Sequence, residues 1–464
     1  MNRTLLSLLF FSLPLLALAD ARPNFVIFVA DDMAWEDCGA YGHPTIRTPN
    51  IDALAKNGIR FERAYLTCSS CSPSRCSILT GRYPHSTGAG ELHLPLPAQQ
   101  TMFTKPLKEA GYWTAAVGKW HLGEAVAGQV DDRKPSRAES MGNAWVQMLT
   151  DRPKEKPFFL WAAHSDPHRG YKRGAVDPPH AAADVVVPAF FPDTPEVRED
   201  LALYYDEISR FDQHIGMVLN ELDRQGIAEN TFVLVISDNG RPFPHCKTRV
   251  HVPGVRTPFI VRWPKVVRGG TTSRQVVSTV DIAPTILRLA GLKPLDSFQG
   301  RSFAPVLSGA KMLIRQYAFA EHNWHDYRAF ERGVHSRRYC YVRNWLPNIP
   351  GTPPADAVNS PTYAVMKQLH ALGKLSEAQQ GCFETPRPTE FLYDVESDPN
   401  CITNLAADPT LKSTLEAMRG ALDQWQTETD DHFPGVENLT PDGFDRTTGK
   451  RLIKAAHPSL QKQG

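Results

Sequence analysis

Short apolar runs recur along the chain, and each of them ends at polar residues. The first covers residues 25–30 and stops at Asp31 and Asp32. Four similar runs follow, at residues 113–117, 158–163, 232–236 and 259–261. A continuous apolar run that ends at polar residues is typical of a strand covered by helices on both faces. We therefore predict a buried, mostly parallel sheet with polar side chains at the carboxyl ends of its strands.

Helical periodicity separates these runs. Apolar positions recur at spacings of three and four over residues 50–58, 104–110 and 198–225. Strands that alternate with helices predict an α/β domain, whose ligands bind where the carboxyl ends of the strands meet. We expect the polar residues that follow the runs, including Arg262 after the last one, to converge on one crevice.

The pattern weakens past Ser308. Short aromatic segments such as residues 338–342, and a proline-rich stretch over residues 346–361, predict a smaller α+β domain with a few antiparallel strands. A helix over residues 409–429 closes it. We set the boundaries at 20–310 for the larger, catalytic domain and at 311–464 for the smaller one, which we expect to contribute substrate-binding residues.

The first residues are typical of an export signal. Arg3 precedes an apolar run over residues 5–18, and Ala17-Leu18-Ala19 is a cleavage signal, which together predict a signal peptide over residues 1–19. The run is shorter than the ~20 residues that a membrane-spanning helix needs. We expect an exported protein, periplasmic or secreted, with no membrane span. The cysteines fit an oxidising compartment, and Cys382 and Cys401 are candidates for a disulfide.

Composition limits the partners of the protein. The 464 residues carry a formal net charge of +1, so the chain has no broad basic field for nucleic acid or an anionic membrane. With 42% hydrophobic and 22% charged residues it is an ordinary globular protein. An anionic ligand must therefore be met by local charges.

Two pairs of oxygen ligands follow predicted strands, namely Asp31-Asp32 and Asp238-Asn239. Oxygen ligands suit a hard divalent cation, Ca²⁺ before Mg²⁺, and poorly suit zinc. Each pair taken singly could instead cap the following helix or turn. Two such pairs at matching strand ends favour the metal site.

A cysteine-rich segment lies between these pairs. It contains Cys71-Ser72-Pro73-Ser74-Arg75 and then Leu79-Thr80-Gly81. Chemistry alone leaves three interpretations open: a disulfide, a soft-metal site, or a reactive thiol beside Arg75. The spacing resembles the signature of the type I sulfatases, whose cysteine is oxidised to Cα-formylglycine. Other stretches match landmarks of that family in the same order, at residues 31–32, 48–52, 118–123, 157–168, 237–240 and 392–405.

The resemblance implies a fold and an activity. The fold is an alkaline-phosphatase-like α/β domain, with a mixed, mostly parallel sheet, followed by a small C-terminal α+β domain. The activity is calcium-dependent hydrolysis of sulfate from a sulfated saccharide, after maturation by a formylglycine-generating or other sulfatase-maturing enzyme. Within the family, residues 158–169, 187–195 and 238–244 most resemble the heparan N-sulfatases (sulfamidases), which act on N-sulfoglucosamine.

Three alternatives stay open beside the sulfamidase interpretation. One is an O-sulfatase that acts on glycosaminoglycans or on marine polysaccharides such as carrageenan or ulvan. Another is hydrolysis of phosphate or phosphonate esters, which enzymes of the same superfamily catalyse. The third is a non-catalytic protein that binds sulfated glycans and keeps Cys71 unmodified.

Matching positions imply the following roles. The ligands of Ca²⁺ are Asp31, Asp32, Asp238, Asn239 and the modified Cys71. The hydrated aldehyde at position 71 provides one hydroxyl as nucleophile and a second hydroxyl whose collapse releases sulfate. The remaining catalytic candidates are Arg75, which steadies the formylglycine, Lys119 and His121 beside the hydrate or sulfate, His168 as acid for the leaving group, and Lys247 as its basic partner.

Other candidates carry weaker signals. A polar cluster near the start of the smaller domain could bind a sugar or could be an ordinary exposed loop; it consists of Glu321, His322, His325 and Arg328. His121 is also a candidate base for the elimination step. His164 lies four residues before His168 and competes for its role, but we interpret it as a neighbour or core residue. We interpret Cys38, Cys68 and Cys76 as structural.

Overall fold

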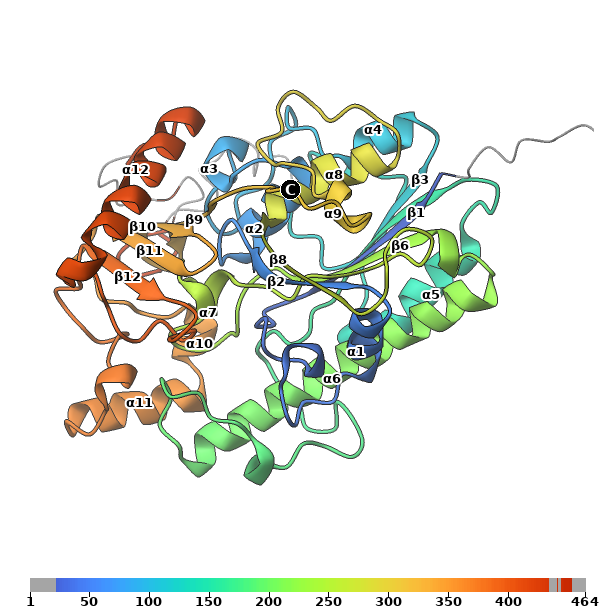
Figure 1. The fold of residues 1–464 in the computed structure, drawn as a ribbon. Coiled ribbons are helices and arrows are strands. Elements are labelled where there is room, and N and C mark those ends of the chain that lie inside the picture. Colours follow the sequence, from blue (N-terminus) through green and yellow to red (C-terminus); the bar gives the residue numbers. More distant parts are fainter. Residues whose placement is uncertain (1–21, 434–439, 441–443, 453–464) are drawn as a thin grey trace, which may run out of the picture.

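The computed structural model describes residues 22–433, 440 and 444–452, and the predicted signal peptide lies outside this part of the chain. Within it the strands form two separate sheets of eight and four strands (Figure 1). The two sheets lie next to each other, with helices around both (Figure 1). The larger sheet carries the residues that concern us most.

The larger sheet is mixed and mostly parallel, as predicted. Its order is β4-β3-β5-β1-β6-β7-β2-β8. Strand β1 lies between β5 and β6 and is parallel to both. The strands are β1 (Asn24–Ala30), β2 (Ile59–Tyr65), β3 (Trp113–Gly118), β4 (Asp132–Lys134), β5 (Phe158–Ala163), β6 (Thr231–Ser237), β7 (Ile260–Arg262) and β8 (Thr271–Ser278).

Strand β7 differs from the expectation. It runs antiparallel to β6 and β2, so Arg262 ends at the opposite edge of the sheet from Asp31 and does not join the crevice. The reason is the connection from β6, which contains only the short helix α7 (Val252–Val255). This connection is long enough for a crossover, but its residues Asn239 and Lys247 lie in the cluster at the carboxyl edge of the sheet, and the chain re-enters the sheet from that edge.

Helices cover both faces of this sheet (Figure 1). Alternate residues of β1 point to opposite faces: Phe25 and Ile27 belong to one apolar core, and Val26 and Phe28 to the other. The first core includes side chains of α2 (Cys71–Thr80), α4 (Thr104–Glu109), α8 (Ile282–Leu289) and α9 (Ala304–Leu307). The second includes side chains of α1 (Pro49–Lys56), α5 (Met141–Asp151) and α6 (Pro195–Arg224). A single-turn helix, α3 (Pro84–Thr87), follows α2.

The smaller sheet is antiparallel, as expected for the C-terminal part. Its order is β12-β11-β10-β9, with β9 (Ala318–His325), β10 (Tyr327–His335), β11 (Tyr339–Asn344) and β12 (Glu390–Asp394). The predicted closing helix begins with a 3₁₀ turn at Pro409–Leu411 and continues as α12 (Lys412–Thr429). Two helices, α10 (Ala355–Val358) and α11 (Pro361–Ala371), lie between β11 and β12. The boundary at residue 310 stays a prediction.

Two further expectations concern membrane-spanning helices and the cysteines. Among the residues described, no helix combines the length and apolar content that a bilayer crossing requires. All eight cysteines are buried free thiols, so the disulfide between Cys382 and Cys401 is absent. Cys401 packs instead with Cys340 in an apolar cluster beneath the smaller sheet, and Cys382 lies outside that cluster.

Gly118 provides a test of how β3 delivers the next residue, Lys119. It has φ +100°, and a Cβ there would lie 1.8 Å from the carbonyl oxygen of Ala163 on β5. We expect Gly118→Ala to lower the free energy of unfolding by about 2 kcal/mol or more, since positive φ and overpacking both cost energy. Denaturant unfolding measures this.

Gly128 is the matched control, because no atom lies within 4 Å of its added Cβ. Gly128→Ala should change the free energy of unfolding by no more than about 0.5 kcal/mol. Equal stability of the two variants would contradict the close approach of β3 and β5.

Candidate active site

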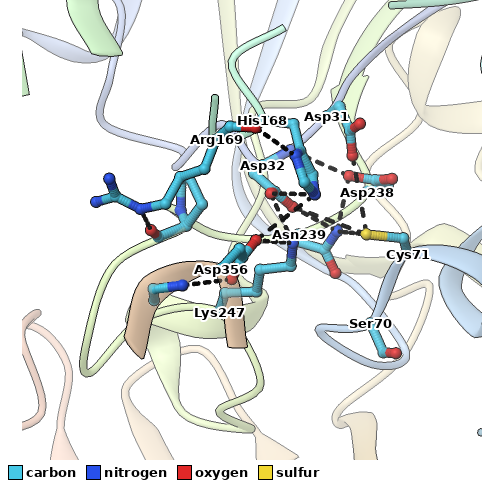
Figure 2. A network of polar contacts seen from close by, with 12 residues as sticks. Asp31, Asp32, Ser70, Cys71, His168, Arg169, Asp238, Asn239, Lys247 and Asp356 are labelled. Atoms are coloured by element: carbon cyan, nitrogen blue, oxygen red, sulfur yellow. Dashed lines mark hydrogen bonds and ion pairs between the residues drawn. The ribbon is translucent and has the colours of Figure 1, made fainter. Parts of the chain in front are cut away.

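The predicted metal ligands and Cys71 meet at the carboxyl edge of the larger sheet. Asp31 and Asp32 follow β1, Asp238 and Asn239 follow β6, and the parallel register pairs Ala30 with Ser237. Cys71 is the first residue of α2. The Nδ2 of Asn239 donates to the Cys71 Sγ at 3.2 Å, and this sulfur lies 3.8 Å from the Oδ1 of Asp31 (Figure 2). Segments 40 to 168 residues apart in sequence therefore form one cluster.

The donor set of this cluster fits a hard cation. Ligand atoms of Asp31, Asp32 and Cys71 all lie within 4.8 Å of one another. The Oδ1 of Asn239 is buried without a hydrogen-bond partner in the described part of the chain. A buried acceptor of this kind requires an explanation. The Nδ2 of Asn239 faces Asp32 and Asp238, at 2.8 and 2.9 Å, so a 180° rotation of the amide would bring its oxygen beside the carboxylates, where it is a donor that Ca²⁺ binds. The residues present therefore fit Ca²⁺.

Two basic side chains offset the buried carboxylates on the side of Cys71. The Nε of Arg75, one helical turn after Cys71, donates to Asp238 Oδ2 at 2.7 Å. The Nζ of Lys119 lies 2.6 Å from Asp31 Oδ2. Without such pairing, burial of these carboxylates would cost several kcal/mol each. Arg75 and Lys119 thus lie beside the predicted metal ligands, and their catalytic roles stay predictions.

The protonation of Cys71 bears on its chemistry. Burial is the largest influence, and it raises the pKa of the Cys71 thiol to about 12 although Lys119 and Lys247 oppose it. The thiolate is the reactive form of cysteine, so an unmodified Cys71 would be a weak nucleophile near neutral pH. This disfavours the reactive-thiol interpretation.

Burial affects the two neighbouring carboxylates differently. It raises the pKa of Asp32 to about 6, although Lys247 and His168 favour its ionised form. Burial is also the largest single influence on Asp31, but Lys119, His168, Arg75 and Lys247 together outweigh it, and the pKa of Asp31 falls below its ordinary value. The balance between burial and the neighbouring charges therefore sets the pKa of each carboxylate in this cluster.

His168 and Lys247 approach the cluster from the side opposite Cys71 (Figure 2). The Nδ1 of His168 is 3.0 Å from the Arg169 carbonyl oxygen and must donate to it, which leaves Nε2 toward Asp32, 3.8 Å away. The Nζ of Lys247 donates to Asp32 Oδ2 at 2.7 Å. The side chain of His168 is 33% exposed and that of Lys247 only 1%, so the histidine reaches the solvent side of the cluster.

Asp356 completes this side of the site, and sequence reasoning missed it. Its Oδ2 accepts from the Nζ of Lys247 at 3.0 Å and lies 3.5 Å from the Nε2 of His168. Burial alone would raise its pKa, but Lys247 and His168 outweigh burial and lower it. Asp356 belongs to α10, in the proline-rich stretch that lacks periodicity, so no pattern pointed to it.

His121 lies apart from the sulfur in the described contacts. Its Nε2 is 3.1 Å from the Nδ1 of His93, and its Nδ1 is buried without a partner in the part of the chain described. Burial, helped by Lys119 and His93, lowers the pKa of His121 well below its ordinary value. A neutral imidazole suits a base, but the role of His121 stays a prediction.

The structure separates the four predicted sugar-binding residues. His325 bonds the Oγ of Ser70, which precedes Cys71, through its Nδ1 at 2.8 Å. Glu321 is fully buried and bonds His85 at 2.9 Å, and His322 is buried too. Arg328 lines a cavity of about 380 Å³ together with His85. His325 alone of the four therefore has a described side-chain hydrogen bond next to Cys71. Glu321 contacts this part of the chain through its backbone N–H, which donates to the Thr67 carbonyl oxygen at 2.8 Å.

A second cavity, of about 350 Å³, adjoins the catalytic cluster. Asp31, Lys119 and His168 form its inner wall. Its other polar lining residues are Glu139, Ser165, Asp166, Arg169, Lys172, Glu207 and Arg210. Sequence reasoning missed Glu139, Lys172, Glu207 and Arg210, because they lie on helices and loops with no motif.

The histidine and cysteines assigned to the core are buried. His164 is fully buried, bonds His214 at 2.9 Å, and accepts from the backbone N–H of Asp166 at 2.8 Å. This agrees with its interpretation as a core residue and leaves His168 as the histidine at the site. Cys38, Cys68 and Cys76 are at most 3% exposed.

Known proteins resemble this chain over most of its length. The family described as Sulfatase matches residues 23–292, and the family described as N-sulphoglucosamine sulphohydrolase, C-terminal, matches residues 245–347. N-sulphoglucosamine sulphohydrolase of Homo sapiens is 32% identical over 490 residues, which cover 92% of this chain and 94% of that protein. An ulvan-active sulfatase of Formosa agariphila is 30% identical over 459 residues, which cover 88% of this chain and 76% of that protein.

Solved structures share the fold. A protein in complex with its substrate D-glucosamine-2-N,6-O-disulfate has a TM-score of 0.67 at 20% identity, covering 89% of this chain and 99% of that chain. A 2-O GAG sulfatase has a TM-score of 0.68 at 20% identity, covering 94% of this chain and 99% of that one. These neighbours confirm the predicted alkaline-phosphatase-like fold class.

Calcium binding can be tested without an activity assay. We expect Ca²⁺ to raise the midpoint of thermal unfolding and a chelator to lower it again, because a cation at a hundred times its dissociation constant stabilises by ~2.7 kcal/mol. Mg²⁺ should give a smaller shift. Asn239→Ala should lose the shift, since it removes the unpartnered amide oxygen.

Asn143→Ala is the control, because Asn143 is an exposed residue of α5. It should keep the full response to Ca²⁺. An Asn239→Ala variant that keeps the same Ca²⁺ response would contradict this assignment of the cation site.

Proposed function

The chain belongs to the sulfatase family, and we propose that it hydrolyses sulfate from a sulfated carbohydrate, with N-sulfoglucosamine units of heparan-type saccharides as the leading substrate. The family makes the protein a hydrolase of the sulfatase class. The substrate is our proposal. The match to the N-sulphoglucosamine sulphohydrolase C-terminal family over residues 245–347 supports it.

One observation carries the catalytic part of the proposal: the Cys71 sulfur lies against the oxygen ligands. It is 3.2 Å from the Asn239 amide nitrogen, and 3.8 and 4.0 Å from Asp31 and Asp32. A cysteine used only for packing would not need three polar neighbours of this kind. The contact supports conversion of Cys71 to formylglycine at a cation site.

Asp31, Asp32, Asp238 and Asn239 would hold Ca²⁺, with the oxidised residue 71 beside them. The cation and the aldehyde hydrate supply, when present, a counter-charge for the sulfate oxygens and a hydroxyl nucleophile. The chain's own residues bind and orient the sulfate around them. Lys119 is 21% exposed, so its ammonium group can reach a sulfate oxygen from the neighbouring cavity.

The leaving group needs a proton, and His168 can deliver it. Its Nδ1 is engaged by the Arg169 carbonyl, so Nε2 is the atom that faces the reacting bond. Lys247 lies next to it on the same side and adds positive charge near the bond to be broken. General acid catalysis by a positioned histidine contributes about a hundred- to ten-thousandfold in rate.

The proposal extends to maturation and location. A formylglycine-generating or other sulfatase-maturing enzyme would be the partner that oxidises Cys71. Export to a periplasm or to the outside would follow from the predicted signal peptide and would give access to extracellular polysaccharides.

An O-sulfatase is the second candidate. The similarity to an ulvan-active sulfatase, 30% identical over 88% of this chain, favours it. Both candidates need the same cluster around Cys71, so they differ in the leaving group and in the sugar. Defined substrates separate them.

Maturation should oxidise Cys71. Mass spectrometry of the peptide with Cys71, from protein made in a host with the maturation machinery, should detect the aldehyde or its hydrate. Cys76 is a built-in control in the same segment and should stay a thiol. An intact thiol or a disulfide at Cys71 would contradict the enzymatic interpretation.

Calcium-dependent sulfate release tests the proposed activity. A panel of defined N- and O-sulfated saccharides, with Ca²⁺ and with chelator, should give calcium-dependent release, fastest from a terminal N-sulfoglucosamine. His168→Ala should lower the rate by about a hundredfold or more, because it removes the acid. His370→Ala, an exposed histidine of α11, should leave the rate unchanged. Normal sulfate release by His168→Ala would remove His168 from the mechanism.

A further inference from the structure

Asp356 is the most solvent-exposed carboxylate of the catalytic cluster. Its side chain is 19% exposed, whereas those of Asp31, Asp32 and Asp238 are at most 2% exposed. His168, next to it, is 33% exposed. The buried end of the cluster therefore lies at Cys71, and its solvent side is formed by a histidine and a carboxylate.

The position of Asp356 is fixed from two directions. The Oδ2 of Asp326, at the turn between β9 and β10, accepts from the backbone N–H of Ala355 at 2.8 Å. The Oδ1 of Asp356 accepts from the N–H of Ala357 at 2.7 Å. Its Oδ2 is thereby directed toward Lys247 and His168 (Figure 2). The smaller sheet thus holds this carboxylate in the catalytic cluster.

Lys247 does not neutralise Asp356 completely. Its single ammonium group lies between two carboxylates, 2.7 Å from Asp32 and 3.0 Å from Asp356. It also occupies the position that a second cation between Asp32 and Asp356 would need. Asp356 therefore remains a partly exposed acidic group on the solvent side of a site for an anion.

A carboxylate in this position repels a sulfated substrate, because like charges at short range cost energy. Protonated His168, 3.5 Å away, offsets part of this repulsion. That charge leaves when His168 gives its proton to the leaving atom, and from then on the offset requires a cationic leaving atom. Since the sulfuryl group binds at the buried end, the atom next to His168 and Asp356 is the leaving atom. A leaving nitrogen can become cationic in the reaction, and an ester oxygen does not.

We propose that Asp356 recognises the leaving nitrogen of an N-sulfated amino sugar and makes the enzyme prefer sulfamates over sulfate esters. The inference rests on the proposed sulfatase function. It adds a specificity-determining residue, supplied by the smaller domain, that the sequence motifs do not contain.

In the proposed step the proton of His168 and the electron pair of the S–N bond both end on nitrogen. His168 Nε2 gives its proton to the sulfamate nitrogen, which then carries a positive charge next to the Asp356 carboxylate. The S–N bond breaks, and its electron pair stays on nitrogen. The sulfuryl group passes to the nucleophilic oxygen at position 71 as that oxygen gives up its proton to water. The amine leaves neutral and takes up a proton from water to form an ammonium ion.

The leaving oxygen of a sulfate ester does not become cationic. Its leaving oxygen receives the proton of His168 as the S–O bond breaks and becomes a neutral hydroxyl, so no cation forms beside Asp356. The carboxylate then offers only an ordinary hydrogen bond. A hydrogen bond to a charged group is worth more than one between neutral groups, and this difference sets the preference.

The test compares kcat/KM for an N-sulfated and a 6-O-sulfated glucosamine with the wild type, Asp356→Asn and Asp356→Glu, all in the formylglycine form with Ca²⁺. We expect Asp356→Asn to lower kcat/KM on the N-sulfated substrate about ten- to a hundredfold. The change on the O-sulfated substrate should stay below about threefold. Asp356→Glu, which keeps the charge, should restore part of the loss.

Asp423→Asn is the matched control, because Asp423 is a 61% exposed carboxylate of the same domain, paired with Arg343. It should change neither rate. An equal loss on both substrates, or no loss on either, would overturn the inference and leave the sulfatase activity intact. A wild type that acts on the O-sulfated substrate alone would also overturn it. A wild type that releases sulfate from no member of the panel would defeat the proposed function itself.

Product inhibition of the wild type gives a second measurement that needs no folded variant. At pH 6 an amine with an ordinary pKa of about 8 is almost fully protonated. Glucosamine should then inhibit about tenfold more strongly than N-acetylglucosamine, whose amide carries no charge. Equal inhibition by the two sugars would contradict a carboxylate that recognises the leaving nitrogen.

Discussion

Compensation of buried negative charge is the constraint on which the rest of the structure depends. Asp31, Asp32 and Asp238 are at most 2% exposed and lie together at the ends of β1 and β6. Such a cluster is tolerated only with cations beside it. Arg75 and Lys119 provide part of the compensation. The buried, unpartnered Asn239 oxygen indicates a metal ion as the remainder, with the amide rotated so that this oxygen faces the carboxylates.

The fold supplies these charges from separate elements. The parallel pair β1 and β6 brings the carboxylates side by side, and α2 delivers Cys71 and Arg75 from the same helical face. The smaller sheet adds the other side of the cluster through Asp356 on α10. Both domains therefore contribute to the site. The larger domain provides its buried end at the Cys71 sulfur, and the smaller domain provides the Asp356 carboxylate on its solvent side.

Much of this could be predicted from sequence, for physical reasons. Strands β1 and β6 are covered on both faces, so they read as continuous apolar runs, and the residues directly after them could be assigned to the crevice. Arg262 was misplaced because periodicity carries no strand direction. Asp356 was missed because its position depends on a long-range contact, from Asp326 to Ala355, in a stretch without periodicity. Glu321 shares a polar segment with His325, but its side chain bonds His85 rather than a residue beside Cys71.

The central claim is that one cation and the oxidised Cys71 share a single site. The most direct measurement is a crystal structure of the matured protein with Ca²⁺. The account predicts one ion about 2.3–2.6 Å from oxygens of Asp31, Asp32, Asp238 and Asn239, with an oxygen of residue 71 beside it. An ion bound elsewhere, or an unmodified sulfur turned away from an empty Asp and Asn cluster, would contradict it.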